Sequence, residues 1–229
     1  KSALNFQSTL IKFASFGNTR LVSSLLWSHT LLFSDTTHYL DQTSYSWMYY
    51  RFKNISEIEP YFYQNYLWGG MYLSVIKDDD LGAEKHLLRG ISFFPQDKNL
   101  SFYLGMHYMY ELKNYQSANT YFKLAYKNGH PYKTLPSTIA KLDHLNESVS
   151  AESYLLPFEA SKTEKNEMFK TRYFEMAYQL KAEFDLKCLN TLQKNCNKTD
   201  LEGNIYLLKN GQWTPVKDFS NKLKLNRKH

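Results

Sequence analysis

The chain has 229 residues, of which 43% are hydrophobic and 17% aromatic, so it can bury a sizeable core. Its nine glycines and six prolines are too few for a collagenous or low-complexity protein. The formal net charge is +6, but residues 216–229 alone contribute +4 of it. Because nucleic-acid binding requires a clustered basic face and not only a basic tail, we expect no nucleic-acid partner.

The N-terminal part, residues 1–59, is predicted to be helical and to end in a degenerate first repeat. Apolar residues at helical spacing predict three helices, over 4–16, 20–32 and 43–58. Thr19 is the expected N-cap of the second helix, in which one face is expected to carry Leu21, Ser24, Leu25, Ser28, Leu31 and Leu32.

Residues 60–131 contain two copies of one pattern, 35 residues apart. The matching pairs are Gly70 and Gly105, Ala83 and Ala118, Leu87 and Phe122, and Gly90 and Ala125. Self-similarity at this period predicts stacked helical hairpins. The expected helices span 60–76 and 81–93 in the first copy, and 99–111 and 115–128 in the second.

Two of the matching residues, Gly70 and Gly105, lie inside expected helices, where glycine costs about 1 kcal/mol relative to alanine. We expect the compensation to be close approach of a neighbouring helix. Ala83 and Ala118 suit the facing positions, and Leu87 and Phe122 are then expected to fill the space between hairpins.

Residues 66–131 resemble the tetratricopeptide repeat (TPR) family, with one extra residue over the family's usual period of about 34. The resemblance rests on Gly70, Ala83, Leu87, Gly90 and Pro95, and on Leu104, Gly105, Tyr108, Ala118, Phe122, Ala125 and Pro131. It implies a right-handed superhelix whose concave groove, lined by the first helix of each repeat, binds extended peptides or protein tails. Residues 47–52 and 67–72 are also similar to bacterial envelope-associated repeat proteins.

The resemblance also places candidate residues on the groove. They are Gln64, Leu67, Met71, Ser74, Val75, Asn99, Phe102, Met106, Met109 and Tyr110. Methionine and aromatic side chains predict an apolar and adaptable groove. The alternative, that flanking helices cover these residues, stays open.

Residues 132–194 are predicted to form a divergent helical hairpin, over 136–145 and 151–160, and a long capping helix over 164–192. Residues 195–229 follow as a β-hairpin and a basic tail. Asn210-Gly211 predicts a type I′ turn between strands over 203–208 and 212–216. The hairpin should either pack on the last helix or pair with another chain, with Tyr206, Leu208 and Trp213 as its partner-binding residues.

Cys188 and Cys196 are the two cysteines of the chain. If the last helix ends between them, the chain can fold back and form a disulfide, which favours an oxidising compartment. Two separate thiols in a cytoplasmic protein are the alternative. We therefore expect a periplasmic or otherwise extracytoplasmic protein, with membrane proximity through a removed N-terminal anchor or through the basic tail.

Catalytic motifs are missing from the sequence: it has no GxSxG, HExxH, Walker loop or GxGxxG pattern. We expect no enzyme, metal, cofactor or small-molecule substrate. The sequence thus predicts an all-α protein, an α-solenoid of antiparallel hairpins with a small C-terminal β-hairpin. Its expected function is a non-catalytic scaffold or adaptor that assembles or tethers subunits of a larger complex. A peptide-binding or chaperone-like module is the alternative.

Overall fold

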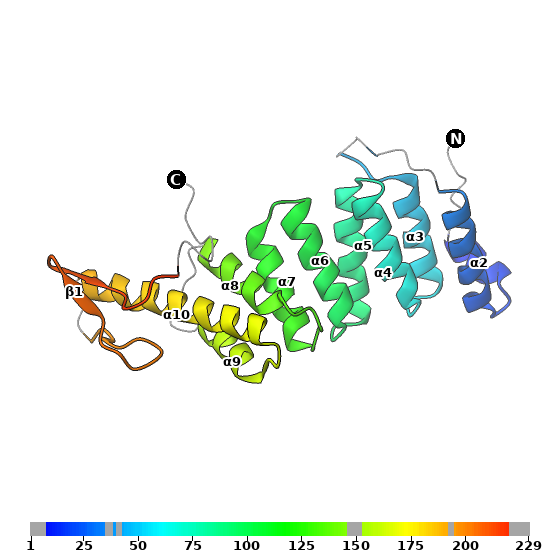
Figure 1. Ribbon diagram of the computed structural model, residues 1–229. Coiled ribbons are helices and arrows are strands. Elements are labelled where there is room, and N and C mark those ends of the chain that lie inside the picture. The colour runs from blue at the N-terminus through cyan, green and yellow to red at the C-terminus, as the bar shows by residue number, and fades with distance from the viewer. Residues whose placement is uncertain (1–7, 35–38, 40–42, 146–152, 192–194, 220–229) are drawn as a thin grey trace. The chain divides into compact units, whose positions relative to one another are not determined.

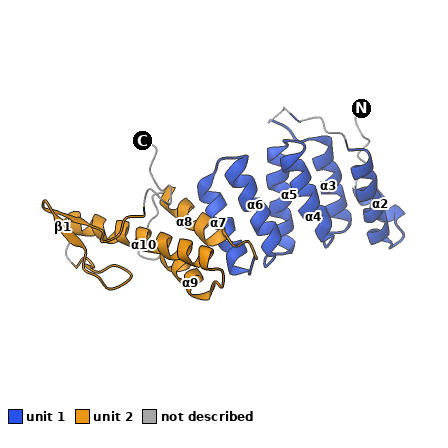
Figure 2. Cartoon of the chain, viewed as in Figure 1, with its two compact units in different colours: residues 1–130 blue, residues 131–229 orange. Residues whose placement is uncertain are grey.

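The computed structural model describes residues 8–34, 39, 43–145, 153–191 and 195–219. Within these ranges the chain forms ten helices and one two-stranded antiparallel sheet. The expected mostly helical class with a small β-hairpin is thus confirmed. The chain divides into two compact units, unit 1 over residues 1–130 and unit 2 over residues 131–229 (Figure 2). The finer domain boundaries at 59/60 and 194/195 stay predictions.

Unit 1 contains seven helices among its described residues (Figure 1). They are α1 (Ser8–Ala14), α2 (Thr19–Leu32), α3 (Trp47–Ile58), α4 (Tyr63–Val75), α5 (Asp80–Phe93), α6 (Lys98–Tyr110) and α7 (Tyr115–Lys127). From α2 to α7 each helix packs against the next one in the chain, and α4 also packs against α6. Buried Met48, Phe52 and Ile55 of α3 form one core cluster with Leu73 of α4 and Ala83 of α5.

Helix starts in unit 1 depend on capping side chains that the apolar pattern does not show. The helix expected from residue 43 begins at Trp47, because Ser46 accepts a hydrogen bond from the backbone N–H of Tyr49. The predicted cap Thr19 is wrong, since Thr19 is the first helical residue and its hydroxyl donates to Glu59 at 3.1 Å. Residues 4–7 of the first expected helix lie outside the described residues.

The 35-residue sequence repeat is also a structural repeat. Helix α6 begins and ends 35 residues after α4, and α7 begins 35 residues after α5. The loops match as well, because Asp78 and Lys113 both have positive φ, of 55° and 52°. The backbone N–H that follows each of them donates back into the first helix, from Asp79 to the carbonyl of Leu73 and from Asn114 to that of Tyr108.

The repeated glycines let the two helices of each hairpin approach closely. A Cβ atom on Gly70 would lie 2.5 Å from Leu87 of α5, and one on Gly105 would lie 2.7 Å from Phe122 of α7. Leu87 and Phe122 therefore pack onto the glycine within their own hairpin. The residues that face the glycines are thus Leu87 and Phe122, and not Ala83 and Ala118 as expected from the sequence.

Unit 2 is built on one long helix, α10 (Glu167–Asn190), which contacts both α8 (Leu135–Leu145) and α9 (Leu155–Thr163). Strands β1 (Leu207–Lys209) and β2 (Gln212–Thr214) form the hairpin. Asn210 and Gly211 connect them with φ of 50° and 80°, as a type I′ turn requires. The strands are shorter than expected because Ile205 bridges to Thr199 and not to β2.

Candidate functional site

A small cavity among the described residues of unit 1 is lined by α4, α5 and α6 and is here called the α4–α6 cavity. Its volume is about 190 Å³. It is lined by Met71, Ser74 and Val75 of α4, by Leu87 of α5, and by Tyr103, Met106, His107, Tyr110 and Glu111 of α6. Pockets for small ligands commonly have ~300–1,000 Å³, so this cavity suits one apolar side chain better than a cofactor.

The repeat places equivalent residues on two sides of the cavity. Met71 and Met106 occupy the same repeat position, as do Val75 and Tyr110. Val75 is 64% exposed and Tyr110 is 50% exposed, so both belong to the rim. Two flexible methionines beneath an exposed rim give an apolar site that can adapt to the shape of its occupant.

The polar groups at the base of the cavity are satisfied within the protein. The imidazole Nε2 of His107 donates to the backbone carbonyl of Asp80 at 3.0 Å. Since a carbonyl can only accept, Nδ1 is the accepting nitrogen, and Ser74 donates to it at 2.8 Å. Burial lowers the pKa of His107, so the ring is neutral at pH 7 and the base of the cavity carries no charge from it.

The other candidate groove residues lie elsewhere. Leu67 is buried. Phe102 is also buried, and its ring stacks on His130 at a centroid distance of 4.1 Å. Asn99 is half-buried and donates to the hydroxyl of Tyr63 at 3.4 Å, whereas Gln64 is exposed. Met109 is half-buried and does not line the cavity. The cavity therefore unites Met71, Met106 and Tyr110 with Ser74 and Val75.

Four lining residues were absent from the expected set: Leu87, Tyr103, His107 and Glu111. A signal for two of them was present, because Tyr103 and His107 lie three residues before Met106 and Tyr110 and so share their helix face. Leu87 could not be found this way, because it reaches the cavity from α5 only through the close packing at Gly70.

The β-hairpin was the second candidate site, and α10 covers two of its three predicted residues. Tyr206 is 2% exposed, and its hydroxyl donates to Asp185 of α10 at 2.9 Å. Burial, followed by the charge of Asp185, raises the pKa of Tyr206. Trp213 is half-buried against α10, whereas Leu208 is exposed on β1. Of the three residues, Leu208 alone offers an exposed side chain.

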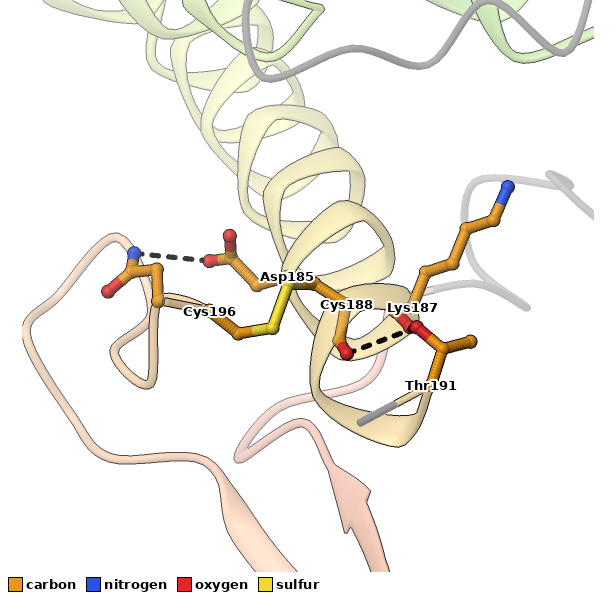
Figure 3. Close-up of a disulfide and its surroundings, with 6 residues drawn as sticks. Asp185, Lys187, Cys188, Thr191 and Cys196 are labelled. Atoms are coloured by element: carbon orange, nitrogen blue, oxygen red, sulfur yellow. Dashed lines mark hydrogen bonds between the residues drawn. A yellow bond between two sulfur atoms is a disulfide. The ribbon is translucent and has the colours of Figure 1, made fainter. Parts of the chain in front are cut away.

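A disulfide joins α10 to the segment that precedes the hairpin. Cys188 and Cys196 are bonded with a Cα–Cα distance of 5.6 Å (Figure 3). Helix α10 ends at Asn190, so the chain reverses direction between the two cysteines, as the sequence predicts. Nearby, the Asn197 amide donates to Asp185 at 3.3 Å. The bond is compatible with an extracytoplasmic location.

Comparison with known proteins gives no assignment. No protein-family model, curated protein or solved structure matches the chain. Across the residues that the structure describes, none of the helices has the length and apolar character needed to cross a membrane.

Proposed function

We propose that the chain is a non-catalytic scaffold with TPR-like repeats, and that it binds a protein partner through an apolar side chain inserted into the α4–α6 cavity. The observation that carries the proposal is the position of this cavity, between equivalent residues of the first helices of two structural repeats. The TPR resemblance implies that partners bind to this side of the helices. Further hairpins would extend the same arrangement into an α-solenoid.

The chemistry of the cavity supports a protein partner. Its base is neutral, its walls carry two methionines, and its rim carries the exposed ring of Tyr110. At many protein interfaces a few anchor residues that insert into well-packed, desolvated pockets account for most of the affinity. The acidic side chain of Glu111 at the rim would favour a cation beside the anchoring residue of the partner.

The disulfide and the β-hairpin supply the other part of the proposal. We place the protein outside the cytoplasm, in the periplasm if its source is a bacterium with two membranes, where disulfides persist. The exposed Leu208 on β1 would offer a second contact to the assembled complex.

Site-specific photo-crosslinking in cells that naturally produce the protein tests the cavity. A photoreactive phenylalanine analogue replaces Tyr110 in the full chain, and the same analogue at Tyr126, on α7 and outside the cavity, is the matched control. We expect one discrete crosslinked partner at Tyr110 and none at Tyr126. Adding Met106→Glu should reduce that crosslink about tenfold or more, because a charge would be buried against the bound side chain.

The same experiment distinguishes the scaffold from the alternative function, a chaperone-like module. A chaperone-like module that accepts many apolar peptides, which the two flexible methionines favour, would give a broad smear of crosslinked products that Met106→Glu also removes. A pattern that is identical at Tyr110 and Tyr126, or one that Met106→Glu leaves unchanged, would exclude the cavity as the binding site. Far-UV circular dichroism establishes that the variant has folded.

A further inference from the structure

An unusual amount of apolar surface is exposed on α1, on α2 and on the turn between them. The exposed fraction is 83% for Phe13, 87% for Phe16 and 82% for Leu32. Leu10, Leu21 and Leu25 are each 61% exposed. Single exposed apolar residues are ordinary, but a concentration of large ones within 25 residues marks an interaction surface.

Helix α2 is apolar on two sides, and among the described residues the core cluster that includes α3 packs against one of them. Leu26, Trp27 and Leu31 pack against the core cluster of α3 to α5. The small residues Ser23 and Thr30 are fully buried on that side. Leu21, Leu25 and Leu32 recur at intervals of four and seven residues, so they form a separate stripe along the exposed side.

The charges on this surface have one sign. Residues 8–34 contain Lys12 and Arg20, both exposed, and neither aspartate nor glutamate, although the chain has 22 acidic residues. Two acidic residues at the C-terminal end of α3, Glu57 and the C-cap Glu59, accept hydrogen bonds from these helices. Ser8 donates to Glu57 at 2.7 Å and Thr19 donates to Glu59 at 3.1 Å.

Exposed leucine and phenylalanine side chains on helices that carry cations and no acidic residue of their own are the pattern of an element that lies in the interface of an anionic lipid bilayer. A second copy of the chain is a poorer occupant, because Lys12 and Arg20 would then approach their own counterparts. Helix α2 has 14 residues, fewer than the ~20 of a spanning helix, so it would lie along the surface.

We propose that α1, α2 and their connecting turn bind the protein peripherally to an anionic lipid surface. The apolar side chains enter the acyl boundary, and Lys12 and Arg20 contact the lipid phosphates. This surface shares no residue with the α4–α6 cavity, so it stands whether or not a partner binds there. It would give the scaffold a fixed position at a membrane.

Co-sedimentation of the full chain with vesicles tests the proposal. One vesicle population is phosphatidylcholine alone, and the other contains phosphatidylglycerol in addition. We expect binding to the anionic vesicles that weakens as salt is raised, and at least tenfold weaker binding to the neutral ones. Equal binding to both populations, or to neither, would overturn the proposal.

Variants then locate the binding surface. The triple variant Phe13→Ser, Phe16→Ser, Leu32→Ser should retain its circular dichroism spectrum, because all three side chains are exposed, and should lose at least tenfold in vesicle affinity. Its matched control is Met168→Ser with Ile205→Ser, at two exposed apolar residues of unit 2. This control should bind like the wild type. A loss of vesicle affinity in the control that equals or exceeds the loss in the triple variant would contradict the proposal.

Two further outcomes would also overturn the proposal. In one, neutralising the basic tail at Lys222, Lys224, Arg227 and Lys228 removes binding while the triple variant retains it, which would assign the membrane contact to the tail. In the other, sedimentation without vesicles shows a dimer that the triple variant dissociates, which would make the surface an interface between two copies.

Discussion

The α4–α7 hairpins of unit 1 and the C-terminal hairpin of unit 2 are fixed by different interactions. In unit 1 the contacts between paired helices are apolar and close, with Leu87 on Gly70 and Phe122 on Gly105. In unit 2 the packing of Tyr206 and Trp213 on α10 is supplemented by polar contacts and a covalent bond. Besides Tyr206, Asp185 contacts Lys181, whose ammonium also donates to the carbonyl of Thr199 at 2.6 Å.

The difference follows from the size of each element. A helical repeat buries a continuous apolar face against its neighbours, so side-chain packing alone stabilises it. A two-stranded hairpin of three-residue strands buries too little apolar surface to be stable by itself. Buried polar groups and the disulfide supply the additional stabilisation that the hairpin needs. The two regions should therefore respond to different perturbations.

The largest expected effect is loss of the aromatic contact in the second repeat. Phe122→Ala should lower the free energy of unfolding by about 3–5 kcal/mol, because the ring is buried and its removal leaves a cavity against Gly105. Urea unfolding with hydrogen-exchange detection measures the effect. Amides of α6 and α7 should lose protection while those of β1 and β2 retain it.

The control for this substitution is Phe13→Ala on exposed α1, which should change the stability by less than about 0.5 kcal/mol. If both substitutions had the same effect, or if Phe122→Ala exposed the hairpin amides first, apolar packing would not be what distinguishes the repeats.

The second effect belongs to unit 2. Replacing Cys188 and Cys196 with serine should destabilise the hairpin region by about 2.5 kcal/mol, on a chain-entropy model for a loop of this length. Exchange should increase at β1 and β2 and stay constant in α4–α7. Adding reductant to the wild type should reproduce the change and should not alter the serine variant. A uniform loss of protection across both regions would contradict the distinction.

The third effect is a pH dependence of the stability of unit 1. Its free energy of unfolding should fall by about 2 kcal/mol between pH 7 and pH 5. Burial lowers the pKa of His86 from 6.5 to about 4, and the charge of Arg89 adds to the shift. The folded ring stays neutral while the unfolded ring takes up a proton. The stability that is present above pH 6.5 is therefore lost progressively as the pH falls toward 4.

The shift in His107 has the same direction, so its effect adds to that of His86. His86→Gln should flatten the decline in urea midpoint between pH 7 and pH 5, whatever its effect on the stability at pH 7. An equally steep decline in this variant would assign the pH dependence to other groups.

Much of the fold could be predicted from the spacing of apolar residues and from the residues that form turns. The predicted repeat fixed the boundaries of α4 to α7 within a few residues, and Asn210-Gly211 identified the hairpin turn. Of the two alternatives that the sequence left open for Cys188 and Cys196, the structure has the disulfide, which an unbroken helix would not allow because it would hold the two sulfurs too far apart.

What the sequence did not predict depends on contacts between elements. Periodicity placed Leu31 on the same face of α2 as Leu21, Leu25 and Leu32, whereas Leu31 packs against the core cluster. The spacing could not tell which side of α2 faces the core, because both sides are apolar. The small side chains of Ser23 and Thr30 determine which side of α2 faces the core, since they permit close packing on α3. In the cavity, Leu87 was missed for a related reason: its position depends on the absence of a side chain at Gly70.

The smallest expected effect tests that glycine contact directly. Gly105→Ala should lower the stability by about 1 kcal/mol, because overpacking against Phe122 costs ~1–3 kcal/mol and the alanine returns ~1 kcal/mol of helix propensity. In a Phe122→Leu background, where the facing side chain is smaller, the same substitution should become neutral or stabilising. Urea midpoints of the two single variants and the double variant give this coupling energy. An additive cycle would mean that the glycine is not required for the approach of α7, and that the repeated Gly70 and Gly105 have another role.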